Sequence, residues 1–141
     1  MKFATLSSVL FLTASAYAQT ISMSWPFSHQ TLNRGENTTV VVVRLNSQEP
    51  VTELGIGITL KSCVSGGCDN VQEALGSILY AGPFKPHGEA GNPASTVQEI
   101  SVLVPQDFQT GDAVMSVVRA ALTGDGPHLE TDYSNVTVNV A

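Results

Sequence analysis

Short runs of apolar residues, many of them β-branched, alternate with polar residues along most of the chain. Glycine, proline, asparagine and aspartate interrupt these runs about every ten residues. Alternation with a period of two predicts β-strands, and evenly spaced turn signals are typical of sandwiches and barrels. The pattern predicts seven strands, at about residues 20–25, 38–45, 51–61, 77–80, 97–104, 113–122 and 133–140.

Details of the pattern indicate which side chains face the core. Trp25 continues the apolar phase of its strand, so we expect it in the core. Four consecutive valines, Val40 to Val43, suit a strand that is covered on both faces. From Leu54 to Leu60 the apolar period is a strict two. A short helical turn is expected near residues 70–75, and residues 82–95 form the longest irregular segment.

These elements predict an all-β chain with a single antiparallel β-sandwich domain over residues 19–141. With about seven strands and almost no helical periodicity, an immunoglobulin-like sandwich is the architecture that fits best. The size is that of one domain and is sufficient for a sizeable core.

The first 18 residues have the order of features found in a secretory signal peptide. Lys2 precedes an apolar stretch at residues 6–14, and Ala16-Tyr17-Ala18 supplies the small residues of a cleavage site. We therefore predict cleavage after Ala18 and secretion to the extracellular space. No later apolar stretch is long enough for a membrane-spanning helix, so membrane insertion is not expected.

The charge of the chain argues against nucleic acid as a class of partner. Six basic and 12 acidic residues give a formal net charge of −6, and loss of Lys2 would make the mature domain one unit more negative. A diffuse negative charge disfavours nucleic acid and anionic membrane surfaces.

If the chain is secreted, two kinds of covalent modification can be predicted from its sequence. Cys63 and Cys68 are the only cysteines, and in an exported protein such a pair predicts a disulfide. Asn37 and Asn135 each begin an Asn-X-Thr acceptor sequence for N-glycosylation.

The residue types that catalysis requires are present but do not form a recognisable motif. There is no G-x-S-x-G sequence, and the acidic pairs Asp107/Asp112 and Asp125/Glu130 flank predicted turns, where aspartate commonly has a structural role. The three histidines lie singly in predicted loops. We therefore expect neither an enzyme nor a metal site, and no cofactor.

Loop positions suggest a binding surface. If consecutive strands are antiparallel, residues 46–50, 82–95 and 123–132 share one end of the sandwich. That end would gather Phe84, Lys85, His87, Asp125 and His128 as candidate partner-binding residues. Two alternatives remain open: Phe84 could instead plug the end of the sandwich, and the disulfide loop at the other end could be the binding site.

Five segments in order, behind the predicted signal peptide, resemble the necrosis-inducing secreted protein family of fungi. They are residues 58–63 (ITLKSC), 75–84 (LGSILYAGPF), 104–108 (VPQDF), 111–117 (GDAVMSV) and 133–140 (YSNVTVNV). The resemblance implies a secreted effector that triggers or modulates host cell death and binds a host plant protein of the receptor-associated kinase class. It carries no catalytic motif onto any residue of this chain.

A different class of function is also compatible with a small exported sandwich, namely a cell-wall polysaccharide-binding module without catalytic activity. The two can be told apart by surface aromatics. A planar row of exposed aromatic rings would favour a polysaccharide, and a single aromatic loop tip beside polar residues would favour a protein partner.

Overall fold

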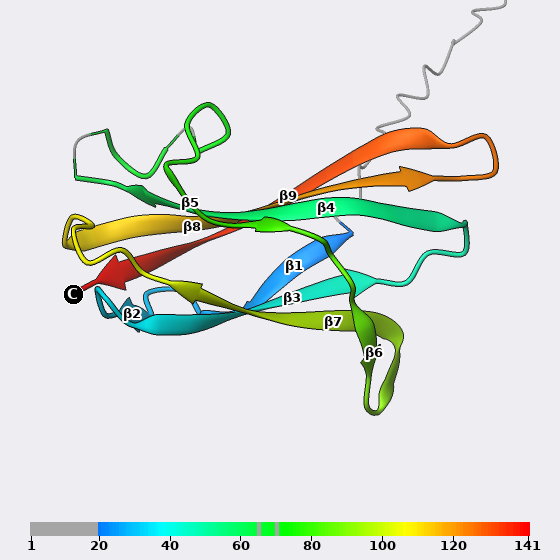
Figure 1. Cartoon of the computed structure of the whole chain (residues 1–141), viewed down its shortest axis with the longest axis horizontal. Coiled ribbons are helices and arrows are strands. Elements are labelled where there is room, and N and C mark those ends of the chain that lie inside the picture. The colour runs from blue at the N-terminus through cyan, green and yellow to red at the C-terminus, as the bar shows by residue number, and fades with distance from the viewer. Residues whose placement is uncertain (1–19, 65, 70) are drawn as a thin grey trace, which may run out of the picture.

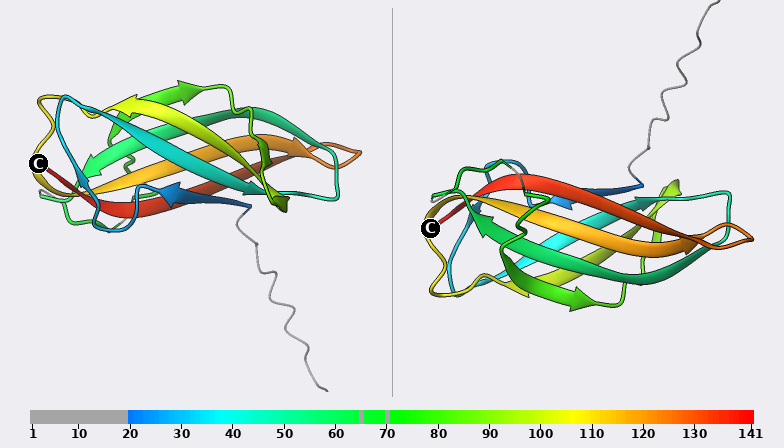
Figure 2. Two further views of the ribbon diagram at one scale, coloured as in Figure 1. Left: turned by 90° about the horizontal axis from the view of Figure 1, so that it is seen from below. Right: turned by 90° about the horizontal axis from the view of Figure 1, so that it is seen from above.

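The computed structural model describes residues 20–64, 66–69 and 71–141. The predicted signal peptide lies outside these residues. Within them the chain forms strands, turns and loops and no helix, as the alternating pattern predicted. Figures 1 and 2 show that most of the strands run along the long axis of the molecule and lie in two layers.

Each of the seven predicted runs forms a strand, and two further strands are short. The strands are β1 (Ile21–Trp25), β2 (Thr31–Leu32), β3 (Asn37–Leu45), β4 (Val51–Ser62), β5 (Ser77–Gly82), β6 (His87–Glu89), β7 (Asn92–Leu103), β8 (Gly111–Thr123) and β9 (His128–Val140). β2 and β6 were not predicted because two or three residues are too few to show an alternation.

The strand order identifies the sandwich as immunoglobulin-like. One sheet has the order β1-β3-β7-β6 and the other β2-β9-β8-β4-β5. The first order corresponds to strands A-B-E-D of an immunoglobulin domain, and β9-β8-β4-β5 corresponds to G-F-C-C′. All pairings are antiparallel except that of β2 with β9. The predicted fold class is confirmed.

The core lies between the two sheets and is built from the inward phase of each long strand. Val40 and Val42 of β3 face Ile58 of β4 and its neighbours, and Met115 and Val117 of β8 are fully enclosed. Val41 and Val43 are only half-buried. The prediction that both faces of β3 are covered was therefore wrong, because no layer of the described structure packs on the outer face of β1-β3-β7-β6.

Three local predictions also need correction. Leu54 is exposed because a β-bulge shifts the register between Glu53 and Gly55 and ends the strict alternation there. Residues 71–73 form a turn, not a helical turn. The irregular segment at 82–95 is shorter than expected, since it contains β6 and since β7 already begins at Asn92.

Trp25 was expected in the core but lies half-buried at its margin. A register shift between Met23 and Trp25 pairs Trp25 with Val41, a residue of the outward phase of β3, so the inward phase of Ile21 and Met23 does not extend to Trp25. Its ring meets that of the exposed Phe27 edge to face, with centroids 4.6 Å apart and planes at 75°.

Candidate binding surfaces

Three connections meet at one end of the sandwich, as strand counting predicted. The turn at residues 46–50 contacts both of the others: Asn46 donates its backbone N–H to Ala94 O (2.9 Å), and Gly124 donates to Pro50 O (3.0 Å). In Figure 1 this end is on the right, with the β3–β4 turn between the β8–β9 hairpin and the β6–β7 hairpin. We call it the hairpin end. In antibody variable domains, the corresponding B–C and F–G loops carry the antigen-binding residues.

Phe84, the aromatic candidate, is not available to a partner. Its side chain is 3% exposed and belongs to the core cluster. The cause is the path of the chain, which leaves β5 in one sheet and enters β6 in the other, so that the ring is inserted between the sheets. The interpretation of Phe84 as a buried plug is therefore correct, and the disulfide loop stays an untested alternative for the binding site.

The remaining four candidates are exposed but do not form one cluster. Lys85 and His87 lie on the approach to β6 and on β6 itself, whereas Asp125 and His128 lie at the β8–β9 hairpin. Lys85 donates its backbone N–H to Gln98 Oε1 (2.6 Å), and His128 Nε2 is 3.0 Å from Thr123 Oγ1. Among the described residues, no hydrogen bond or ion pair joins the two pairs.

Exposed leucines at the hairpin end were missed by the sequence reading. Leu129 is 63% exposed and Leu54 54% exposed. Leu129 pairs in register with the half-buried Leu122 of β8, and Leu54 lies in the bulge of the next strand, β4. The sequence did contain a signal for the exposure of Leu129. Val136, Val138 and Val140 face the core, so the odd-numbered positions of β9, including Leu129, face outward.

A buried arginine holds the strands beneath these leucines. Arg119 lies on the inward phase of β8 and is 1% exposed. Its guanidinium makes two hydrogen bonds to Glu53 (2.7 and 2.9 Å), one to Asp132 (2.7 Å) and one to Glu130 (3.3 Å). Glu53 also forms an ion pair with Arg44 of β3 (3.3 Å), which links the two sheets.

The Arg119 network stays ionised, and it positions the backbone of the residues next to it. Burial alone would lower the pKa of Arg119, but its hydrogen bonds and charge attraction to Glu53 and Asp132 outweigh burial and raise that pKa. Arg119 therefore stays protonated at any accessible pH. Glu53 immediately precedes Leu54 and Glu130 immediately follows Leu129, so the backbone that presents both leucines is fixed from inside.

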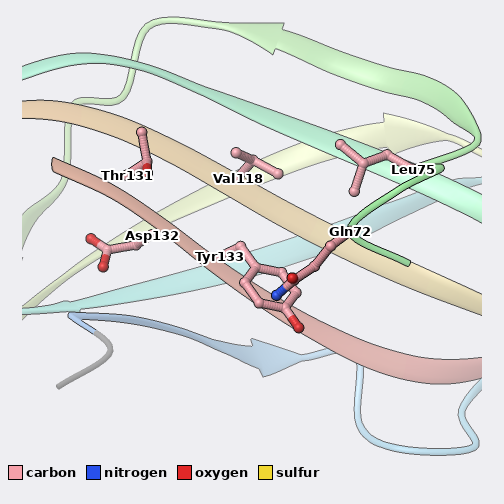
Figure 3. A pocket seen from close by; sticks show the side chains of 6 residues that line it. All are labelled: Gln72, Leu75, Val118, Thr131, Asp132 and Tyr133. Carbon is pink, nitrogen blue, oxygen red and sulfur yellow. The ribbon is translucent and has the colours of Figure 1, made fainter. Parts of the chain in front are cut away.

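A groove lies further along the outer face of the five-stranded sheet. It has a volume of about 370 Å³ and is lined by Gln72, Leu75, Val118, Thr131, Asp132 and Tyr133 (Figure 3). Residues 71–75 form one wall, where Val71 is buried and Gly76 leads the chain into β5, close to Leu60 of β4. Gly76 has φ of +80° and no room for a Cβ, which would lie 2.3 Å from Leu60 O.

The opposite end of the sandwich holds the disulfide loop. Cys63 and Cys68 are bonded, with a Cα–Cα distance of 4.7 Å, as predicted. The backbone N–H of Cys63 is bonded to Asp112 O (2.9 Å), so the loop lies beside the start of β8. Asn37 and Asn135, the two glycosylation candidates, are both exposed.

The described part of the chain holds neither a cluster of metal ligands nor a membrane-spanning helix. No three His, Cys, Asp or Glu side chains there come close enough to hold a metal ion. The same residues include no helix that is long and apolar enough to cross a membrane.

With the geometry described, comparison with known proteins identifies the family. The model of the Nis1 family matches residues 14–139, which is most of the chain. This chain belongs to the Nis1 family. The family takes its name from necrosis-inducing secreted protein 1, so the resemblance seen in the sequence is supported at the level of the family.

The chain was also compared with curated proteins and with solved structures. No curated protein matches the chain. Among solved structures, the fibronectin(III)-like modules of Clostridium thermocellum CbhA align over 86% of this chain and 98% of their own, with 12% identity and a TM-score of 0.38.

Proposed function

We propose that this Nis1-family protein is a secreted effector that modulates plant immunity or cell death by binding host proteins, with receptor-associated kinases as the class of partner. Membership of the Nis1 family carries this proposal. The disulfide is in keeping with an oxidising, extracellular compartment.

We assign the partner surface to the outer face of the hairpin end. Leu54, Leu122 and Leu129 provide an apolar contact there, on strands that the Arg119 network holds rigid. Rigid presentation lowers the entropy lost on binding. Asp125 and His128, at the β8–β9 hairpin, form the polar margin of this surface, whereas His87 and the neighbouring Lys85 lie on the β6 side of the sandwich.

Charge at this end indicates the complementary chemistry of the partner. Glu49 and Asp125 are exposed beside the β8–β9 hairpin, where a Cβ added to Gly124 would lie 3.7 Å from Glu49 Oε2. We expect the partner to present an apolar patch bordered by basic side chains. Association should then slow as the salt concentration rises, because charges at an interface margin act mainly on the association rate.

Capture from plant extract tests the function. Secreted, tagged protein is immobilised beside a tagged Leu54→Ser/Leu129→Ser variant, and the retained proteins are identified by mass spectrometry. Enrichment of receptor-associated kinases on the wild type alone supports the proposal. If neither form retains a host protein and the wild type sediments with cell-wall polysaccharide, the alternative binding-module function is correct.

The described surface aromatics form no planar row of the kind that would favour a polysaccharide, and the buried Phe84 is not the aromatic loop tip that would favour a protein partner. Flat sugar-binding platforms need coplanar exposed rings, whereas Trp25 and Phe27 meet at 75°. No other aromatic–aromatic ring pair is found in the described part of the molecule.

A further inference from the structure

Asn135 and Tyr133 lie side by side on the outer face of β9. Residues two apart on a strand share a face, and the inward phase of this strand is occupied by Asp132 and Val136. Asn135 Nδ2, the atom to which an N-glycan is attached, donates a hydrogen bond to Tyr133 Oη (3.4 Å). A glycan on Asn135 would therefore begin beside the Tyr133 ring.

The groove next to this ring has the chemistry that a sugar requires. Tyr133 offers an aromatic ring, Leu75 and Val118 offer apolar contact for the C–H faces of a pyranose, and Gln72 and Thr131 supply an amide and a hydroxyl. Its volume of about 370 Å³ lies at the small end of the range for ligand pockets. In the view of Figure 3 the Gln72 side chain overlaps the Tyr133 ring, and both residues line the groove.

We propose that the glycan on Asn135 folds back over Tyr133 and that its first N-acetylglucosamine units occupy this groove. The proposal rests on the secretion proposed above, because N-glycans are added only to exported chains, and it does not depend on the host partner. Asn135 lies six positions beyond Leu129 on β9, so the glycan would cover the middle of the outer face and leave the hairpin end open.

The second acceptor provides an internal control. Asn37 is exposed at the first residue of β3, and the residue two positions before it is Gly35, which has no ring. A glycan on Asn37 has no comparable aromatic neighbour in sequence. The two sites therefore differ in the feature on which the proposal depends.

The test compares both glycans in the folded protein. The chain is secreted from a eukaryotic host, site occupancy is read by glycopeptide mass, and each glycan is trimmed to one N-acetylglucosamine. In the NMR spectrum, the N-acetyl methyl on Asn135 should be shifted upfield by the Tyr133 ring current, while that on Asn37 should keep its solution position.

Two substitutions make the assignment specific. Asn135→Gln should remove the shifted methyl and lower Tm by about 3 °C, whereas Asn37→Gln should leave both unchanged. Tyr133→Ala should return the Asn135 methyl to its solution position.

Any of several outcomes would overturn the glycan proposal. An unshifted methyl on an occupied Asn135, or a shift that survives Tyr133→Ala, shows that the glycan does not occupy the groove. Occupancy of Asn37 without Asn135 disproves the proposal and leaves secretion intact. Absence of both glycans, with an uncleaved N-terminus, counts against secretion itself.

Discussion

Arg119 shows what a single residue contributes to this fold. Its position could have been predicted, because Ala113, Met115, Val117 and Ala121 place odd-numbered residues of β8 inside. Its partners could not, since Glu53, Glu130 and Asp132 reach it from two neighbouring strands whose register only the folded chain defines. A buried charge needs such partners, because burial without them is costly.

Replacing Arg119 should therefore be strongly destabilising. Arg119→Met leaves Glu53 and Asp132 without their main partner and should lower the free energy of unfolding by about 3–5 kcal/mol. Arg119→Lys should lower it by less, since one ammonium keeps the charge but loses the two-pronged contact with Glu53. Urea unfolding measures both. The exposed Arg34 is the control, and Arg34→Met should change stability by under about 0.5 kcal/mol. Equal stability of Arg119→Met and the wild type would show that the network is not structural.

Phe84 illustrates why a candidate binding residue can be misassigned from sequence. Prolines on both sides hide any strand period, so its burial depends on the crossing between sheets, which involves segments distant in sequence. Phe84→Ala should cost about 3–5 kcal/mol of stability through cavity formation. Phe27→Ala, at a ring that is 61% exposed, should cost under about 1.5 kcal/mol. Thermal unfolding compares the two, and similar losses would mean that Phe84 is not a core residue.

At the scale of elements, the long strands follow directly from the alternation of apolar residues. Errors arise where an element departs from regularity: the bulge at Leu54, the brief β2 and β6, and the early start of β7. β6 and the start of β7 form a short hairpin without apolar alternation, whereas the bulge and β2 depend on pairing with strands far away in the sequence. The local alternation of apolar residues does not reveal such long-range strand pairing.

The disulfide loop is an element whose contribution can be measured separately. Cys63→Ser/Cys68→Ser should lower stability by about 2 kcal/mol, since the bond closes a short loop in the unfolded chain. The circular dichroism spectrum should stay that of a β-sandwich, because both residues follow β4 and lie outside the core cluster. Loss of the β spectrum would show that the bond is required for folding.

At the scale of the whole molecule, the sequence predicted the fold class and the end at which three connections meet. It did not predict which side chains are exposed on that surface. Exposure of Leu54 and Leu129 and burial of Phe84 both follow from how the sheets are stacked and bulged. The molecule thus presents an apolar face made of leucines where an aromatic loop tip was expected.

The central claim is that this face of the hairpin end binds the host partner. It is tested most directly by titrating the protein onto the immobilised kinase domain of a plant receptor-associated kinase. Leu54→Ser/Leu129→Ser should raise Kd at least about tenfold, or about 1.4 kcal/mol, with an unchanged circular dichroism spectrum. Leu103→Ser is the matched control, since Leu103 is equally exposed at 54% but lies on the other sheet. We expect its Kd to equal that of the wild type. No binding by the wild type, unchanged Kd in the double variant, or an equal loss with Leu103→Ser would contradict the claim.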